Sequence, residues 1–360
     1  MLVTGYPGLR ARAFVREVLA AEPETRLIAL VHPARRAEAE ARLDQEPERS
    51  RVRLVAGDPT AIDFGLDASS YAELAATVTV VQHFYQVLDR AVTAETANAI
   101  TVGGAREIVE FARAAKALER LIHHSSVFVS GERTGLVREG ELQMGQRFRS
   151  PVEEALAIAE KMLGNAAPVP VTVVRAADVV GDSRTGEVDR LYGVYAPLVF
   201  LARTPAGARV PLPPRSEVPV QVIPADYLAR AARVLARQPD AAGKTVQLVD
   251  PQALSARRLL ELCAARFGLE LEPGINAIFG KALFGNPGVS LMMKNLRTLG
   301  DLLAPGVVYD DTNARALLSG SGVTCPSLES YLGVLIDALQ RKLGTGAFSG
   351  HSSEAWDVVD

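Results

Sequence analysis

A glycine turn near the start of the chain constrains the possible folds more than any other feature of the sequence. A short apolar run leads into Val3-Thr4-Gly5-Tyr6-Pro7-Gly8-Leu9-Arg10-Ala11, and the next segment is amphipathic, with apolar residues on one side at Phe14, Val15, Val18 and Leu19. This order predicts a strand, a tight turn and a helix. Gly5 permits the turn, Gly8 lets the backbone approach a phosphate, and Ala11 keeps the helix close to the strand. Because the first N–H groups of a helix lack partners, the turn is typical of a pyrophosphate site for a dinucleotide.

The composition describes a globular chain that can bury a large core. Its 360 residues are 48% hydrophobic and 22% charged, and the net charge of −3 gives no electrostatic footprint for nucleic acid. No apolar run has the length of a membrane span, and the first strand leaves no room for a signal peptide. Cys263 and Cys325 lack the spacing of metal ligands or a redox pair. We expect a cytoplasmic protein without a metal site and without nucleic-acid or membrane partners.

Further apolar runs alternate with amphipathic segments along the chain. They lie at 26–31, 52–55, 77–81, 121–131, 171–175 and 244–249. Strands that alternate with helices in this way predict an α/β fold with a doubly wound parallel sheet.

The end of the second predicted strand bears on the choice of cofactor. An acidic residue there would hold the ribose 2′-hydroxyl of NAD, but this chain has His32, Arg35 and Arg36, which could meet the 2′-phosphate of NADP. The alternative is that Arg35 and Arg36 are solvated positions on the following helix. The sequence therefore favours NADP over NAD.

Several motifs resemble the extended short-chain dehydrogenases/reductases, the group that includes the NAD-dependent epimerases and dehydratases. The glycine turn has the Thr-Gly-x-x-Gly-x-x-Ala form found in that family, and the segment 222–228 resembles its Val-Pro-Val-Asp-x-Val hinge. Gly181-Asp182-Ser183-Arg184-Thr185-Gly186-Glu187 is close to a stretch of the thioester-reductase and fatty-acyl-reductase branch. The resemblance implies a Rossmann-type sheet in residues 1–182, completed by segments at about 218–250. It further implies a smaller, mostly helical substrate lobe from 183–217 and 251–345, before a flexible tail at 346–360.

The same resemblance implies a set of cofactor-binding residues. They are the turn residues Thr4, Gly5, Tyr6, Pro7, Gly8 and Leu9, with Asp58 and Pro59 at the adenine and Ser125, Ala177 and Val179 along the cofactor. The family usually has small residues after the fourth strand, in the pattern His-x-Ala-Ala. Here the sequence is His83-Phe84-Tyr85, and we expect the two aromatic side chains to lie against the cofactor and crowd its ribose or nicotinamide.

The catalytic positions of the family are mostly vacated. Counted from Gly131, Ser126 falls at the hydroxyl that hydrogen-bonds the substrate oxygen. An alignment through Phe148 and Ala159-Glu160 puts Val152 at the tyrosine position and Leu156 at the lysine position, and Thr101 lies where an asparagine is expected. The lysine normally lowers the pKa of the tyrosine so that the phenol can transfer a proton near neutral pH. Another donor would be required, and the candidates are Tyr85, His83, His124, a substrate group or water.

Two functions remain open. The first is an NAD(P)H-dependent reductase of a hydrophobic carbonyl or thioester, with Ser126 polarising the oxygen. The second is a catalytically silent relative that binds a dinucleotide or a hydrophobic ligand as a sensor, scaffold or partner protein. The apolar segment 275–300 could form a lobe over a greasy substrate or simply be packed in a core. A small hydrophobic molecule is the expected partner, and a homodimer is allowed.

Overall fold

The computed structural model describes residues 1–191, 193–212, 216–272 and 306–344. The apolar segment 275–300 and the predicted tail at 346–360 lie outside the described residues. Within the described ranges, the helices are all too short or too polar to cross a membrane. The same residues gather no group of three or more His, Cys, Asp or Glu side chains that could hold a metal ion.

The predicted doubly wound parallel sheet is confirmed. The described residues form a seven-stranded sheet in the order β11-β7-β5-β4-β1-β2-β3, and every neighbouring pair is parallel. Its strands are β1 (Leu2–Thr4), β2 (Leu27–Val31), β3 (Val52–Ala56), β4 (Val80–His83), β5 (Arg120–Ser126), β7 (Val171–Ala176) and β11 (Thr245–Leu248). The strand order reverses at β1, and the crevice beside such a reversal is where α/β sheets bind ligands.

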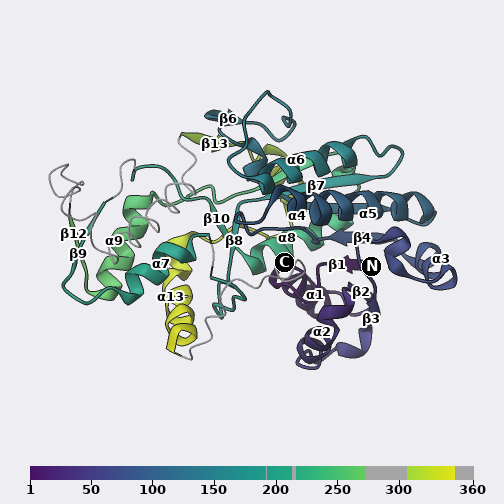
Figure 1. The fold of residues 1–360 in the computed structure, drawn as a ribbon, viewed down its shortest axis with the longest axis horizontal. Helices are drawn as coiled ribbons and strands as arrows, with labels where there is room; N and C mark the ends of the chain where they lie inside the picture. The colour runs from purple at the N-terminus through teal and green to yellow at the C-terminus, as the bar shows by residue number, and fades with distance from the viewer. Residues whose placement is uncertain (192, 213–215, 273–305, 345–360) are drawn as a thin grey trace.

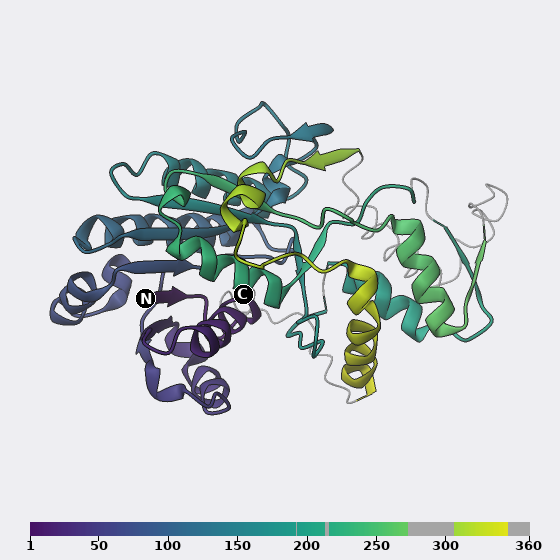
Figure 2. The ribbon, with the colours of Figure 1, turned by 180° about the vertical axis from the view of Figure 1, so that it is seen from behind.

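Helices cover both faces of the sheet (Figures 1 and 2). One face carries α1 (Leu9–Ala21), α2 (Arg36–Leu43), α8 (Ala225–Arg237) and α12 (Thr312–Leu318), whose apolar residues share one core. The other face carries α3 (Ala68–Thr77), α5 (Gly103–Ala114) and α6 (Pro151–Gly164), which share a second core. All seven residues of β5 and all four of β4 are buried, as expected for parallel strands with helices on both sides. In both strands apolar residues are followed by buried polar ones, because their carboxyl ends carry His83, His123, His124 and the two serines of β5.

The helix that precedes β5 contains a wider turn. It starts as α4 (Ala94–Ala97), passes through a π-helical turn at Asn98–Val102 and continues as α5. The π-turn contacts α6, and Gly104 at the start of α5 approaches the side chains of Tyr85 and His83. Such turns are frequent at functional sites, and this one lies beside the carboxyl end of β4.

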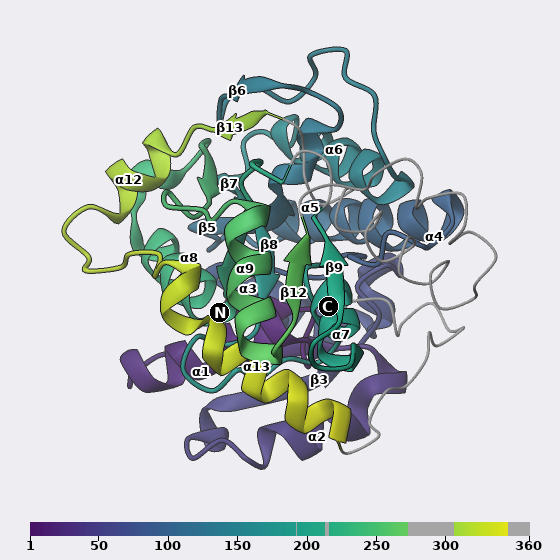
Figure 3. The same ribbon diagram turned by 90° about the vertical axis from the view of Figure 1, so that its left-hand side faces the viewer.

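A smaller lobe extends from the carboxyl end of the sheet (Figure 3). Its elements are β8 (Asp178–Val180), α7 (Tyr195–Arg203), β9 (Arg209–Pro211), β10 (Val222–Pro224), α9 (Ala256–Phe267), β12 (Glu270–Glu272) and α13 (Leu328–Gly344). The three helices bury their apolar faces in a separate core. The hydroxyl of Ser255 accepts a hydrogen bond from the Arg258 N–H at 3.1 Å and caps the N-terminus of α9.

Short connecting elements complete the described chain. β6 (Gly135–Val137) pairs with β13 (Val307–Tyr309) in a separate two-stranded ribbon. Single 3₁₀ turns occur at Pro33–Arg35, Arg49–Arg51, Ile62–Gly65, Val127–Ser130 and Pro239–Ala241.

Three histidines form a buried layer at the carboxyl ends of β4 and β5. His83 and His123 stack with ring centroids 5.4 Å apart, and His124 stacks on Phe84 at 3.7 Å. His83 bonds the Thr4 hydroxyl at 2.9 Å and His124 bonds the Gln82 amide at 2.7 Å, whereas neither ring nitrogen of His123 has a partner among the described residues. Burial lowers the pKa of His123 to about 3, with a further contribution from Arg10. Burial also holds the pKa values of His83 and His124 well below their usual range, so all three rings are neutral at pH 7.

We expect these histidines to make the fold sensitive to acid. The unfolded chain binds a proton at each ring near pH 6.5, while the folded protein does not, so stability falls as pH is lowered from about 6.5 toward 3. Each ring contributes a slope of up to about 1.4 kcal/mol per pH unit in that window. His123→Phe should reduce the pH dependence of the free energy of unfolding by the contribution of one titrating ring. Its cost in stability at pH 7 should be small, because the His123 ring nitrogens make no hydrogen bond among the described residues that the substitution could remove. Urea denaturation at several pH values measures both quantities, and an unchanged slope in His123→Phe would contradict the assignment.

Candidate functional site

The glycine turn lies at the carboxyl end of β1, at the reversal of the strand order. Gly5 has a φ of +87°, a conformation that strongly favours glycine, and its carbonyl accepts a hydrogen bond from the Gly8 N–H at 2.8 Å. Gly8 is the N-cap of α1, so the N–H groups of Leu9 and Arg10 belong to the unpaired first turn of the helix. Pro7 has no N–H to offer. The residues of the turn are all buried, and their backbone fits the phosphate-binding geometry expected from the sequence.

The side chains of the turn serve the fold. The Thr4 hydroxyl bonds His83 and accepts the Tyr85 N–H at 3.3 Å, which joins β1 to the end of β4. Tyr6 packs in the core with residues of α1 and α2, and burial raises the pKa of its phenol to about 12. A dinucleotide at this turn would therefore meet backbone groups rather than the hydroxyls of Thr4 and Tyr6.

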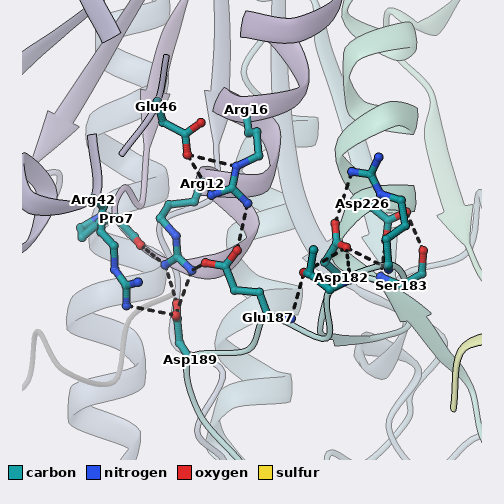
Figure 4. Close-up of polar contacts among 12 residues, drawn as sticks. Pro7, Arg12, Arg16, Arg42, Glu46, Asp182, Ser183, Glu187, Asp189 and Asp226 are labelled. Atoms are coloured by element: carbon teal, nitrogen blue, oxygen red, sulfur yellow. Dashed lines mark hydrogen bonds and ion pairs between the residues drawn. The ribbon is translucent and has the colours of Figure 1, made fainter. Parts of the chain in front are cut away.

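A buried arginine connects the turn to the substrate lobe (Figure 4). Arg12, which is 3% exposed, donates to the Pro7 carbonyl at 2.7 Å. Its guanidinium also forms hydrogen bonds of 2.8 and 2.9 Å with the two carboxylate oxygens of Asp189 and of 2.7 Å with Glu187. Arg16 adds a second bond to Glu187 at 2.9 Å. The loop after β8 is thus fixed against the first helix.

The stretch 181–187 forms a tight turn that joins three helices. The Asp182 carboxylate accepts the N–H groups of Arg184 and Thr185, each at 2.9 Å, and the Ser183 N–H donates to Asp226 of α8 at 2.8 Å. Gly186 has a φ of +70°, and a Cβ there would lie 2.5 Å from the Cβ of Ala338 in α13. In the described residues, the most specific string of the sequence makes structural contacts with α1, α8 and α13.

The two arginines after β2 have different surroundings. Arg36 is exposed and pairs with Glu40 one helical turn away at 2.8 Å, as expected for a solvated helix position. The Arg35 side chain is only 12% exposed and lies 3.0 Å from Glu38. Its charge also acts on the Tyr85 hydroxyl, as does that of Asp58, so Arg35 is directed back toward the end of the sheet.

The other residues around this corner hold the backbone. His32 caps the following 3₁₀ turn, where its Nδ1 accepts the Ala34 N–H at 3.3 Å. Asp58 accepts the N–H and the hydroxyl of Thr60, both at 2.8 Å, and so fixes the turn that contains Pro59.

The aromatic pair after β4 points to opposite sides of the sheet. The Phe84 side chain is fully buried on the α1 side, against Phe14 and His124. Tyr85 lies on the α5 side, where Gly104 leaves room for its ring. Burial raises the pKa of Tyr85, Asp58 raises it further, and no described contact joins its hydroxyl to Ser126. Alternation along an extended segment separates the two rings and relieves the predicted crowding.

The surroundings of His83 and His124 do not favour them as proton donors. Each is only 1% exposed, and burial keeps both rings neutral. Their nitrogens bond Thr4 and Gln82 within the core. A neutral imidazole without access to a substrate cannot deliver a proton to it.

The two serines at the end of β5 have separate roles. The Ser125 hydroxyl donates to Glu160 of α6, and Glu160 forms an ion pair with Arg175 of β7 at 2.7 Å, with both charged side chains 2% exposed. Ser126 is 8% exposed, and its oxygen accepts the Phe128 N–H at 3.3 Å. Since that oxygen serves as the acceptor, the hydroxyl hydrogen of Ser126 remains available to an outside acceptor.

An apolar cluster occupies the region of the vacated catalytic positions. Val152 and Leu156 of α6 are 3% and 2% exposed and pack with Tyr85 and Val129. Thr101 lies in the π-turn, where its hydroxyl accepts the Val87 N–H at 3.1 Å and fixes the loop after β4. In this part of the described chain the tyrosine and lysine are replaced by packing rather than by other polar groups.

Sequence reasoning did not identify Asp178, a carboxyl group on β8 between Ala177 and Val179. Ala177 is buried and bonded to β11, and Val179 is partly buried and pairs with Ile223 of β10. The Asp178 carboxylate accepts the Val194 N–H at 3.3 Å. Burial raises its pKa, against smaller opposing effects of Arg90 and Arg10. The signal available in the sequence was an aspartate between Ala177 and Val179, the two residues expected to lie along the cofactor.

Two arginines complete the surroundings of Asp178. The guanidinium carbon of Arg90 lies 4.3 Å from the centroid of the Phe128 ring, and Phe128 follows Ser126 by two residues. Arg10 is 2% exposed, and in the amide orientation that satisfies Gln86 it donates to that side chain at 2.8 Å. Ser126 also pairs in register with Ala176, two residues before Asp178. The hydroxyl, the carboxyl and the end of β4 therefore belong to one edge of the sheet.

Comparison with known proteins agrees with this arrangement. Residues 3–232 match the NAD-binding family described as Male sterility protein. The chain belongs to this family. It is an extended short-chain dehydrogenase/reductase of the branch that contains thioester reductase domains and fatty acyl-CoA reductases, as its motifs predicted.

The individual relatives have low sequence identity to this chain. A linear gramicidin synthase of Brevibacillus parabrevis is 23% identical over 354 residues, which are 91% of this chain and 7% of that protein. An alcohol-forming fatty acyl-CoA reductase of Simmondsia chinensis is 25% identical over 185 residues, covering 45% of this chain and 38% of the relative. The chain thus spans well under two thirds of either protein.

Solved structures share the fold. The terminal R domain of the myxalamid PKS-NRPS pathway has a TM-score of 0.78 at 24% identity, over 95% of this chain and 90% of that one. The R domain of a nonribosomal peptide synthetase from Mycobacterium tuberculosis has a TM-score of 0.71 at 19% identity, over 95% and 91% of the two chains.

The Arg12 contacts predict a selective loss of stability. Arg12→Ala should lower the free energy of unfolding by about 2 to 3 kcal/mol, because charged hydrogen bonds to two carboxylates and a carbonyl are lost. Arg12→Lys should recover only part of the lost stability, since an ammonium cannot reproduce the paired hydrogen bonds of a planar guanidinium. Arg36→Ala, which removes an exposed pair, is the control and should change stability by less than about 0.5 kcal/mol. Urea denaturation that gives equal losses for Arg12→Ala and Arg36→Ala would contradict this role.

Proposed function

We propose that this protein is an NADPH-dependent reductase of a hydrophobic carbonyl or acyl thioester. The supporting observation is that a phosphate-binding turn, the Ser126 hydroxyl and the Asp178 carboxyl meet at the same edge of the sheet. Family membership supports the dinucleotide, and the activities named for relatives, such as an alcohol-forming fatty acyl-CoA reductase, support an acyl or carbonyl substrate.

Backbone groups and Arg35 would hold the cofactor. The first-turn N–H groups of α1 would bind the pyrophosphate, and Arg35 would meet the 2′-phosphate in place of its contact with Glu38. Arg36 is already engaged with Glu40 and faces solvent. We therefore assign the preference for NADP to Arg35 rather than to both arginines.

Asp178 is the proposed proton donor. A bound dinucleotide would supply the hydride for the carbonyl carbon. Ser126 would donate a hydrogen bond to the carbonyl oxygen, and the protonated Asp178 would transfer its proton to that oxygen and become a carboxylate. With an acyl thioester the product of this step is a hemithioacetal, which loses its hydroxyl proton and expels the thiol to leave the aldehyde. Arg90 and Arg10 stabilise the carboxylate until it regains a proton from water. A carboxyl group whose pKa is raised by burial keeps its proton to a higher pH than an exposed one, and this suits it to act as an acid.

A catalytically silent, ligand-binding role is the second candidate. It is favoured by the apolar packing of Val152 and Leu156, because the buried cluster around these two positions is apolar within the described residues. In this alternative the dinucleotide binds without turnover.

The cofactor assignment can be tested by calorimetric titration. NADPH should bind more tightly than NADH. Arg35→Ala should lower the affinity for NADPH by about tenfold or more and leave the affinity for NADH unchanged, because one charge-assisted contact to the 2′-phosphate is lost. Arg36→Ala should affect neither cofactor. Tighter binding of NADH, or equal effects of Arg35→Ala on both cofactors, would contradict the assignment. Absence of binding at millimolar concentrations would exclude both candidate functions.

The acid can be tested by NADPH oxidation with hydrophobic aldehydes, ketones and acyl thioesters. Asp178→Asn should lower kcat by about 10² to 10⁴ without changing NADPH affinity, whereas Asp178→Glu should retain part of the rate. The wild-type rate should fall as pH rises through the raised pKa of Asp178, because only the protonated form donates. If Asp178→Asn is fully active and Tyr85→Phe is not, the acid is Tyr85. If the wild type binds NADPH but turns over no substrate, the silent role is supported.

A further inference from the structure

Tyr85 has a buried ring and a hydroxyl that the fold does not use. The residue is only 6% exposed and packs in an apolar cluster with residues of α6. The described residues neither bond its hydroxyl nor enclose it. In contrast, the hydroxyl of Tyr195 accepts the Gly181 N–H at 2.9 Å, and that of Tyr331 is enclosed without a partner among the described residues. The Tyr85 hydroxyl is therefore a donor available to a ligand, at the end of a ring that packing holds in place.

The contacts of Tyr85 place its ring between the glycine turn and the turn after β3. Its N–H donates to the Thr4 hydroxyl at 3.3 Å, which ties the residue to the end of β1. A Cβ on Gly104 would lie 3.3 Å from the ring, and a Cβ on Gly103 would lie 3.7 Å from Thr60 in the turn after β3. Two adjacent glycines at the start of α5 thus bring the ring and this turn together at one corner of the sheet.

Two charges of opposite sign act on the Tyr85 hydroxyl. They belong to Asp58, whose carboxylate fixes the turn after β3, and to Arg35, in the 3₁₀ turn after β2. The hydroxyl is thereby directed toward the corner formed by these two turns and not toward Ser126. Burial raises the pKa of the phenol, Asp58 raises it further and Arg35 lowers it less, so the hydroxyl keeps its proton near neutral pH and can donate it in a hydrogen bond.

Building on the proposed NADPH binding, we infer that Tyr85 determines cofactor specificity together with Arg35. The Tyr85 ring forms a wall of the adenosine site, and its hydroxyl donates a hydrogen bond to the 2′-phosphate of NADP. A phosphate has several acceptor oxygens, so the hydroxyl and the guanidinium can bond different ones, while the Arg35 charge offsets the repulsion from Asp58. NAD carries a neutral hydroxyl at this place, and a hydrogen bond to a neutral group is weaker than one to a charged phosphate. The phenol therefore adds to the preference for NADP.

The test is calorimetric titration of the full chain with two matched pairs of nucleotides. NADPH is compared with NADH, and adenosine 2′,5′-bisphosphate is compared with AMP, which restricts the second comparison to the adenosine half of the cofactor. Tyr85→Phe keeps the ring and removes only the hydroxyl. It should lower the affinity for the two nucleotides that carry a 2′-phosphate by about tenfold or more, because a hydrogen bond to a charged group is lost. The affinities for NADH and AMP should not change.

Tyr331→Phe is the matched control. Its hydroxyl is also unpaired among the described residues, but it lies in the core of the lobe, so the substitution should change none of the four affinities. If Tyr85→Phe leaves NADPH affinity unchanged, or lowers all four affinities equally, Tyr85 is not a determinant of specificity although NADPH binding stands. If the wild type fails to bind NADPH at millimolar concentration, the proposed function itself is overturned.

Tyr85→Ala distinguishes a wall of the adenosine site from a side chain that fills it. Loss of a wall should weaken all four nucleotides, because the adenosine loses its apolar contact with the ring. Tighter binding of all four nucleotides to folded Tyr85→Ala would show that the ring occupies the place of the adenosine, and this result would overturn the assigned role.

Discussion

The structure depends most on the buried guanidinium of Arg12. This guanidinium donates to the Pro7 carbonyl at the centre of the glycine turn and also to two carboxylates from the loop after β8. The turn itself has few internal contacts, because Gly5 and Gly8 contribute no side chains and Pro7 contributes no N–H. A charge from the first helix therefore sets both the shape of the turn and the position of the substrate lobe above it. Through this arrangement Glu187, at the end of the Gly181–Glu187 motif, binds the first helix although it lies far from that helix in the sequence.

A second buried ion pair fixes α6, the helix on which the sequence predicts the vacated catalytic positions. Glu160 joins Ser125, Arg175 and α6 across two neighbouring strands, and Arg175 also donates to the carbonyls of Glu139 and Glu141. The Glu139 carboxylate in turn accepts N–H groups from β11 and α12. Breaking such a pair leaves an uncompensated buried charge, so the network resists change. Val152 and Leu156 face no such requirement, and apolar packing is sufficient to hold them.

The sheet could be predicted from the sequence, while several side-chain environments could not. Parallel strands buried on both faces must be short apolar runs, and the runs at 52–55 and 171–175 were found for that reason. The opposite directions of Phe84 and Tyr85 follow from extended geometry, but the space that receives Tyr85 is left by Gly104, which lies in a different element further along the chain. The raised pKa of Asp178 arises from burial, and Arg10 and Arg90 oppose the rise, but none of these surroundings is visible in the local sequence. The surroundings of Arg35 and Arg36 differ because the Arg35 side chain is largely buried and the Arg36 side chain faces solvent, although the two residues are adjacent in the sequence.

The π-turn at Asn98–Val102 has a geometric consequence for the whole helix that contains it. A π-turn holds one residue more than an α-turn, so the residues after it are shifted in phase by about 100° relative to those before it. One continuous helix can thereby present two unrelated faces. Its first part packs against α6, and its second part directs Gly103 toward Thr60 and Gly104 toward Tyr85. A side chain larger than hydrogen at Gly104 would press against the Tyr85 ring, so the large aromatic ring at the end of β4 and the phase of the irregular helix beside it are geometrically coupled.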